Sequence, residues 1–365
     1  MKNNPPGGLK SGYYETILSL LEITGVNIMH IPENYLSPQT CAVMTVAMLP
    51  VWGHAIYKVR KEVSREEMPQ LGINSALSFV GMMFNLPIPG GTTGHAVGGT
   101  LAAITTGPDA ACISVSIALL IQALLFGDGG ILSFGANCFN MAFLLPYVGF
   151  AVYQLLLKAF KGKREVLAAF LAGYVGINVA ALAAAIEFGI QPVLFKDVAG
   201  LPLYCPYGLN IAIPAMMAGH LTLFGVAEGI YTAVLLAFVR KTSKAGAADE
   251  KSAAVMKVER KPLYILLGVL TVFVPLGLLA QGTAWGEWGA DEIAEISQNG
   301  AVLGFTPAGL ANGFSLETIM PDYAIGALPE WLGYILSAVI GIALCMIIFK
   351  LLSAAKKKKT DFAAA

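Results

Sequence analysis

The sequence predicts an all-α integral membrane protein, in which a bundle of about seven membrane-spanning helices precedes two C-terminal spans. Hydrophobic residues make up 56% of the 365 residues. Charged residues make up only 13%, whereas a soluble domain carries about 25%. The mean hydropathy is +0.68. Long apolar stretches recur along the chain, and Lys and Arg gather between them, which favours a lipid bilayer as the environment of the protein.

Nine stretches are apolar enough to form spanning helices, each of which needs about 20 mostly apolar residues. The third is short and follows a glycine-rich loop. Its 13 residues would rise roughly 20 Å across a hydrocarbon core of about 30 Å. We therefore expect irregular backbone here, buried in protein or lining a cavity. The nine predicted spans are residues 38–57, 69–88, 95–107, 109–127, 131–157, 165–186, 209–239, 262–281 and 332–353.

The distribution of Lys and Arg predicts the orientation of these spans. Four segments hold 20 of the 23 Lys and Arg residues. With nine spans, all four segments lie on one side of the membrane, which the positive-inside rule makes cytoplasmic. The opposite side carries an acidic loop, where Trp285 and Trp288 are interpreted as interfacial anchors. The basic segments are 58–65, 158–164, 240–261 and the tail that begins at Lys350.

This arrangement predicts two membrane modules. A charged, Ala-rich segment separates them and is typical of a cytoplasmic linker. The first 28 residues have the features of neither a secretory signal nor a span, and we expect them to lie outside the working fold. The predicted parts are an extension (1–28), a first membrane domain (29–240), the linker (241–261), a two-span module (262–353) whose outer loop is 282–330, and a basic cytoplasmic tail (354–365).

Two of the four histidines, His30 and His95, are predicted to face the outer compartment. His95 lies in the stretch GGTTGHAVGG, where glycines allow the backbone to bend sharply and to approach other groups closely. Two imidazoles on one side, one of them in a glycine-built cavity, suggest a transition-metal site. The alternative is a lone histidine whose ring is satisfied by a backbone carbonyl.

A chain that begins at Met29 would strengthen the case for a metal site. The free amine of Met29, the amide nitrogen of His30 and the imidazole of His30 can then close two adjacent chelate rings. His95 can supply a fourth nitrogen, and four nitrogens in a plane suit Ni(II) or Cu(II), while Co(II) can be accommodated. If residues 1–28 stay attached, the Met29 nitrogen is an amide and a poor ligand. We therefore expect the working chain to start at Met29.

Six further polar residues are candidates for a supporting or transport role. Thr93, Asp128, Asn137 and Asn140 can orient the imidazoles by hydrogen bonds. His220 and Glu228 lie eight residues apart within one predicted span, near a common helix face. Ionisable residues inside a membrane are functional by default, so these two take part either in transport or in a structural pairing between helices.

Three stretches resemble the CbiM/NikM family, the substrate-binding membrane components of cobalt and nickel energy-coupling-factor transporters. They are MHIPENYLSP from Met29, GGTTGHAVGGTLAAI from Gly90 and ALLFGDGGILSFGANCFNM from Ala123. The resemblance covers about 29–240. It implies that Met29, His30 and His95 hold Co(II) or Ni(II) as transported substrate, with no permanently bound cofactor, in the cytoplasmic membrane of a cell that makes cobalamin or uses nickel.

The two-span module is similar to the small accessory subunit, or PDGLE-type domain, found beside or fused to this family. The motifs AWGEWGADEI, TPAGLANG and MPDYAIG carry this similarity. The family implies two kinds of partner, a T-component membrane scaffold and ATPase subunits, since the sequence contains no GxxxxGK[ST] phosphate loop. A zero net charge indicates no nucleic-acid partner.

Two other functional classes are open. A self-sufficient secondary transporter for divalent metals would need coupling carboxylates in its spans, for which Glu228 is the one clear candidate. A membrane enzyme would need a nucleophile–base pair or a carboxylate dyad, and neither pattern is found in the sequence. The sequence therefore predicts a transport subunit and not an enzyme.

Overall fold

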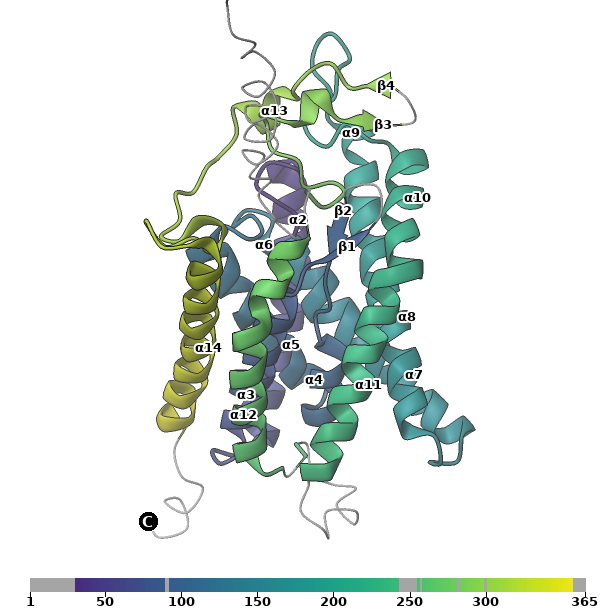
Figure 1. The fold of residues 1–365 in the computed structure, drawn as a ribbon. Coiled ribbons are helices and arrows are strands. Elements are labelled where there is room, and N and C mark those ends of the chain that lie inside the picture. Colours follow the sequence, from purple (N-terminus) through teal and green to yellow (C-terminus); the bar gives the residue numbers. More distant parts are fainter. Residues whose placement is uncertain are drawn as a thin grey trace, which may run out of the picture.

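The computed structural model describes residues 30–88, 92–242, 255–256, 258–280, 283–298 and 301–356. Helices lie alongside one another and form an elongated bundle (Figure 1). Within the described residues, seven helices are long and apolar enough to cross a membrane. The prediction of an all-α, multi-pass membrane protein is confirmed. The predicted extension 1–28 and Met29 lie outside the described residues.

Five of the seven long helices belong to the first part of the chain, and several of them are continuous runs of two or three segments. Pro38 occupies the first turn of the first helix, and the Ser37 side chain caps that helix by accepting a hydrogen bond from the Thr40 amide. The five runs are α2 (Pro38–Glu62); α5 (Pro108–Ile121) with the π-helical η1 (Gln122–Phe126); α6 (Phe134–Asn137) with η2 (Cys138–Leu144) and α7 (Leu145–Ala159); α8 (Glu165–Gly189) with α9 (Gln191–Leu194); and α10 (Leu209–Gly219) with η3 (His220–Phe224) and α11 (Gly225–Thr242).

The second and third predicted spans are shorter than spanning helices. Helix α3 (Met68–Met82) ends six residues before the predicted boundary at residue 88, because Leu86–Ile88 forms strand β1. Strand β2 (Thr92–Gly94) pairs with it in an antiparallel hairpin, with Leu86 opposite Gly94. Helix α4 (Gly99–Thr106) then has only eight residues. The expected irregular backbone after the glycine-rich loop is therefore present, and it includes a hairpin that the sequence did not predict.

The C-terminal module packs directly on the first bundle. It contains α12 (Arg260–Phe273), η5 (Val274–Leu279) and α14 (Glu330–Ala355), and α14 runs along α3. Small residues allow this close approach: a Cβ atom at Gly72 would lie 3.2 Å from Cβ of Phe349, and one at Gly341 would overlap the Phe79 ring. One buried hydrophobic cluster consequently includes residues of both modules.

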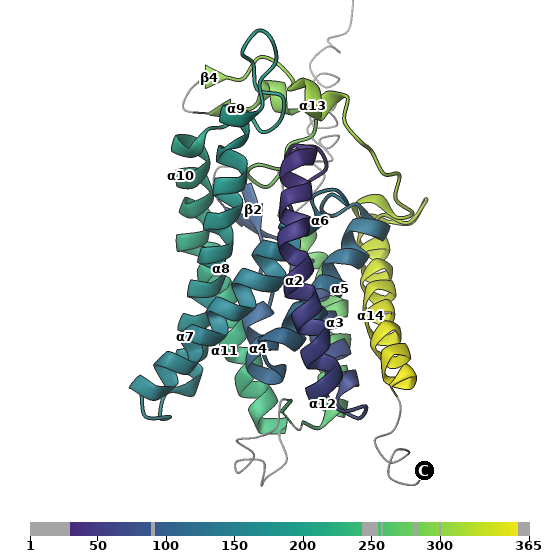
Figure 2. The ribbon, with the colours of Figure 1, turned by 180° about the vertical axis from the view of Figure 1, so that it is seen from behind.

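The outer loop between η5 and α14 crosses the end of the bundle where α2 begins (Figures 1 and 2). Backbone hydrogen bonds fasten it there. Gly309 donates to the carbonyl of Leu203 at 2.8 Å, and Met320 donates to the carbonyl of Leu125 at 2.9 Å. The described elements of this loop are η6 (Ile293–Glu295), β3 (Ser297–Gln298) paired with β4 (Ala301–Val302), α13 (Ala308–Ala311) and η7 (Pro321–Tyr323).

The opposite end of the bundle gathers the described parts of the basic segments. The end of α2, the α7–α8 turn, the end of α11 and the end of α14 all lie there (Figures 1 and 2). Arg240 pairs with Glu165, and the Ser353 hydroxyl donates to the carbonyl of Arg65 at 2.9 Å. The predicted placement of these segments on one side agrees with the fold. The cytoplasmic identity of that side stays a prediction.

We expect single cysteines placed in the basic end to be shielded from a membrane-impermeant thiol reagent in intact cells. Ser252→Cys, in the linker, should react only after lysis, whereas Ala311→Cys, in the outer loop, should react in intact cells, because Lys and Arg are retained on the cytoplasmic side. All five native cysteines are buried, which keeps their background labelling low. Labelling of position 252 but not of position 311 in intact cells would contradict the predicted orientation.

Candidate functional site

The first described residues, His30 and Ile31, are clamped by the loop that follows η1. The amide of Ile31 donates to Oδ1 of Asn137 at 3.0 Å, and Nδ2 of Asn137 donates back to the Ile31 carbonyl at 3.1 Å. The same carbonyl accepts hydrogen bonds from the Ser133 hydroxyl at 2.6 Å and from the Gly130 amide at 2.9 Å. The backbone position of His30 is thereby fixed before α2 begins.

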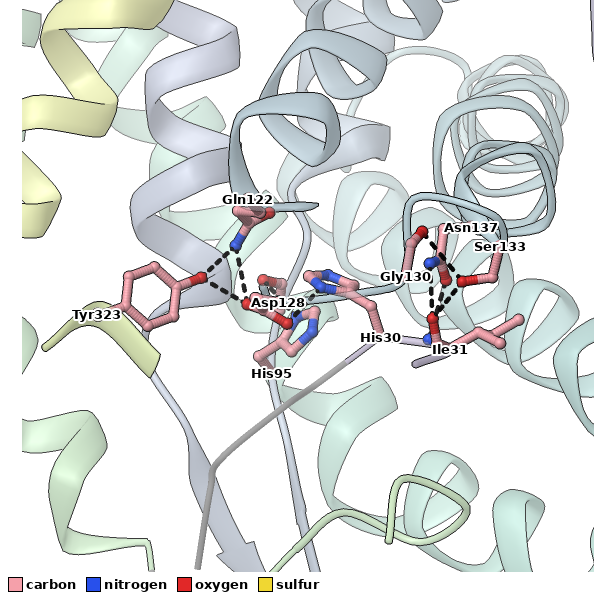
Figure 3. A network of polar contacts seen from close by, with 10 residues as sticks. His30, Ile31, His95, Gln122, Asp128, Gly130, Ser133, Asn137 and Tyr323 are labelled. Carbon is pink, nitrogen blue, oxygen red and sulfur yellow. Dashed lines mark hydrogen bonds and ion pairs between the residues drawn. The ribbon is translucent and has the colours of Figure 1, made fainter. Parts of the chain in front are cut away.

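The His30 side chain is held by a buried carboxylate. Its Nδ1 lies 2.7 Å from Oδ1 of Asp128 (Figure 3). The other carboxylate oxygen, Oδ2, accepts hydrogen bonds from the Tyr323 hydroxyl at 2.5 Å and from Nε2 of Gln122 at 3.2 Å. Burial opposes ionisation of Asp128, but the facing His30 and the hydrogen bond from Tyr323 hold its pKa below the usual range. This network fixes the orientation of the His30 ring.

His95 reaches the same place from the hairpin. The centroids of the His30 and His95 rings are 5.1 Å apart, in an edge-to-face arrangement. Nδ1 of His95 lies 3.3 Å from the carbonyl oxygen of Ala96, so the ring also has the backbone contact that the alternative interpretation expects. The absence of a side chain at Gly94 is required, because a Cβ atom there would overlap the ring of Phe224.

Glu228 holds the backbone that follows His95. This fully buried carboxylate in α11 accepts hydrogen bonds from the amides of Val97 at 2.7 Å and Gly98 at 3.0 Å. Those two amides lie at the start of α4, where a carboxylate complements the helix dipole. Each such charge-assisted bond contributes about 1.5–3 kcal/mol. Glu228 therefore bridges two helices structurally and sets the position of the His95 loop.

The two histidine rings line a cavity of about 110 Å³, which has room for several water molecules. Its walls combine residues of the first bundle with residues of the outer loop. Among the described residues, no group of three His, Cys, Asp or Glu side chains converges as a preformed cation cage. A metal bound here would therefore also need ligands other than these four kinds of side chain. The polar residues in the lining include His30, Thr93, His95, Asn137, Asn140, His220 and Glu287.

The other predicted residues have distinct partners. Asn140 lines the cavity and donates to Oε2 of Glu187 at 2.9 Å, so it contacts a carboxylate and not an imidazole. Asn137 binds the backbone of Ile31, as described above. His220 also lines the cavity, and its Nδ1 bonds the carbonyl of Met216 within the same helical run at 2.9 Å. His220 is the first residue of η3, and Glu228 lies in the first turn of α11. Each of them therefore has its own hydrogen-bond partner.

The outer loop brings to this region two residues that the sequence did not predict for the site, Glu287 and Tyr323. Glu287 lies between two tryptophans in a loop predicted on the same side as the histidines, and that pattern was the available signal. The interpretation of Trp285 and Trp288 as interfacial anchors stays a prediction. Their rings pack together with Tyr207 in an aromatic cluster, and Trp285 lines the cavity.

Burial, together with the negative charge of Asp128, raises the pKa of Glu287 well above its usual range. A cation in the cavity would shift this balance toward the ionised form of Glu287.

Comparison with known proteins assigns the chain to a family. Residues 30–245 match the family model for the cobalt uptake substrate-specific transmembrane region, CbiM. The chain belongs to this family. Residues 260–358 match the PDGLE domain, so the CbiM region and a PDGLE domain are fused in one polypeptide.

Proteins with the same fusion align over nearly the whole chain. The probable fused nickel transport protein LarMN of Lactiplantibacillus plantarum is 47% identical over 335 residues, 91% of this chain and 99% of that protein. The fused nickel transport protein NikMN of Rhodobacter capsulatus is also 47% identical, over 87% of this chain and 94% of that protein. A crystal structure of a truncated transition metal transporter is 57% identical, with a TM-score of 0.56, over 58% of this chain and 99% of that chain.

We expect the glycine beside His30 to be required for the clamp. Gly129 has φ +84°, and a Cβ atom there would lie 2.9 Å from Cβ of His30. Gly129→Ala should therefore lower the free energy of unfolding by about 1–2 kcal/mol, measured as a lower midpoint of thermal unfolding in detergent. Gly53→Ala is the matched control, because that helical glycine has no atom within 4 Å of the added Cβ. An unchanged midpoint for Gly129→Ala would show that the clamp tolerates a side chain.

Proposed function

We propose that the protein is the metal-capturing membrane subunit of an ATP-driven importer of nickel or cobalt. The observation that carries this proposal is the convergence of His30 and His95, whose rings lie 5.1 Å apart in one cavity. Family membership supports it. Nickel is the favoured substrate, because the two fused relatives are named as nickel transport proteins.

In this proposal the substrate is held by nitrogen atoms. The amine of Met29, the amide nitrogen of His30, the imidazole of His30 and the imidazole of His95 form a planar set that suits Ni(II). Two of these four ligands belong to the backbone, which agrees with the lack of a three-side-chain cation cage among the described residues. The clamp on Ile31 supports the scheme, since it fixes the backbone beside these atoms.

Loading would change the orientation of the His30 ring. A chelate that includes the His30 amide can close only through Nδ1, and Nδ1 now contacts Asp128. A half-turn of the ring moves Nδ1 to the opposite edge and brings Nε2 to the Asp128 side. Nε2 is buried and has no hydrogen-bond partner within the described residues, so the exchange gives Asp128 a new donor. A carboxylate behind a metal-bound imidazole makes that imidazole a better ligand.

Transport itself would depend on partners in the cytoplasmic membrane: a T-component scaffold and ATPase subunits that meet the basic end, with the C-terminus inside the cell. The alternative, a self-sufficient secondary transporter, relies on Glu228 as a coupling carboxylate. Glu228 already accepts hydrogen bonds from Val97 and Gly98, which favours a structural role and weakens that alternative.

We expect His30→Ala and His95→Ala each to abolish stoichiometric Ni(II) binding, measured by isothermal titration calorimetry of the purified protein. The loss should exceed the roughly 10- to 100-fold typical of residues that only support a ligand. His54→Ala is the matched control, since the His54 side chain is 60% exposed on α2 at a distance from the cavity. Wild-type affinity of His95→Ala would refute the proposed site.

The residue at which the chain begins should determine its affinity for Ni(II). A chain that begins at Met29 should bind Ni(II) tightly, whereas a chain that retains residues 1–28 should bind far more weakly. Binding by the first chain should weaken as the pH falls, because the metal must displace protons from the terminal amine and from the imidazoles. Mass spectrometry of the mature N-terminus and titration of both chains provide the test. Equal affinities would exclude the amine as a ligand.

A further inference from the structure

The outer loop of the PDGLE domain places a carboxylate in the wall of the histidine cavity. Glu287 lines this cavity together with His30 and His95. Its side chain belongs to a residue that is only 9% exposed, and Oε2 has no hydrogen-bond partner within the described residues. A buried carboxylate oxygen without a partner is costly, and such groups are typical of sites that bind a ligand.

The turn that carries Glu287 is built to hold it in this position. The amide of Glu287 donates to the carbonyl of Ala284 at 3.1 Å. The preceding Gly286 has φ +87°, and a Cβ atom there would lie 2.9 Å from the ring of Phe188. This position therefore requires glycine. Glu292 stabilises the base of the turn by accepting hydrogen bonds from the Thr283 hydroxyl at 3.0 Å and the Gly289 amide at 3.1 Å.

Glu287 and Glu292 therefore have different roles in this loop. Glu292 accepts hydrogen bonds from other residues of the loop, whereas Glu287 lines the cavity with a carboxylate oxygen that has no hydrogen-bond partner within the described residues. Trp285 packs against Phe188 and Tyr207 and also lines the cavity, and Trp288 packs against Tyr207. This part of the outer loop therefore forms one wall of the cavity.

We propose that Glu287 is a loading ligand, which receives the incoming Ni(II) or Co(II) through its carboxylate and passes the ion to the nitrogen ligands around His30 and His95. This inference rests on the proposed function. A carboxylate oxygen can bind a divalent ion that still keeps most of its water, and imidazole and amine nitrogens then bind the same ion more strongly as the remaining waters leave. No covalent bond is made or broken in this transfer. The only changes are the exchange of ligands on the ion and the release of water.

A loading ligand affects the rate of binding more than the final affinity, because it is absent from the final set of ligands. Glu287→Gln also removes a carboxyl group that can ionise and attract a cation inside a closed cavity, and focused charge of this kind accelerates association by about 10-fold or more. We therefore expect Glu287→Gln, which keeps the shape of the side chain, to slow Ni(II) loading about 10-fold or more while the equilibrium dissociation constant changes little.

The experiment measures the rate of Ni(II) loading by stopped flow and the dissociation constant by calorimetry, on the protein purified from membranes. Glu295→Gln is the matched control, because it removes the same charge from an exposed position of the same loop. Glu287→Asp, which retains the carboxylate on a shorter side chain, should load at an intermediate rate. It also provides a second variant if Glu287→Gln has a lower unfolding midpoint.

Three outcomes are distinguishable. Slow loading by Glu287→Gln alone, with wild-type affinity, supports the inference. Wild-type loading rates for both Glu287→Gln and Glu287→Asp, while His95→Ala loses binding, overturn the inference and leave the proposed function intact. A weaker dissociation constant with an unchanged loading rate would make Glu287 a permanent ligand and would also overturn it. Full binding by His95→Ala would instead refute the proposed function.

Discussion

The contact between His30 and Asp128 is the interaction on which the site depends. An imidazole and a carboxylate are buried together near the end of a membrane bundle, where neither is stable without a partner. Their 2.7 Å contact gives each group a partner and orients the His30 ring. Three other features surround this contact. Hydrogen bonds hold the Ile31 backbone, Gly129 leaves room for His30, and the His95 ring packs against the His30 ring. A site assembled in this way can bind a metal ion with a backbone already in place, which limits the entropy lost on binding.

The same contact joins the two modules. Asp128 belongs to the first bundle, but the hydroxyl that holds its second oxygen comes from Tyr323, 195 positions further along the chain. Tyr323 stacks on Phe126 with ring centroids 4.7 Å apart, directly before the turn that carries Asp128. The outer loop therefore touches the site at two points: through Tyr323 behind Asp128, and through Glu287 in the cavity wall. Fusion of a PDGLE domain to the CbiM region keeps both contacts within one polypeptide.

Much of this organisation could be predicted from the sequence, because hydropathy and the placement of Lys and Arg report directly on the membrane. The short helix α4 was predicted from the small number of apolar residues after the glycine-rich loop. The meeting of His30 and His95 was predicted from their placement on the same side of the membrane. The hairpin was not predictable, since three-residue strands inside an apolar glycine-rich run carry no alternating pattern. Partners were assigned less well: Asp128 holds the His30 ring, whereas Asn137 holds the Ile31 backbone, and no spacing distinguishes these roles. Tyr323 and Glu287 reach the site only through tertiary packing, which sequence periodicity does not encode.

X-ray absorption spectroscopy of the Ni(II)-loaded protein, in the chain that begins at Met29, tests the central claim most directly. The amine and the thioether of Met29 are both available as ligands, and only the amine belongs to the proposed planar set of nitrogens. The account predicts a first coordination shell of light atoms, with the multiple-scattering signature of imidazole, the near-edge features of a planar Ni(II) centre and no sulfur. A sulfur ligand, or a six-coordinate shell of oxygen atoms without imidazole, would contradict it.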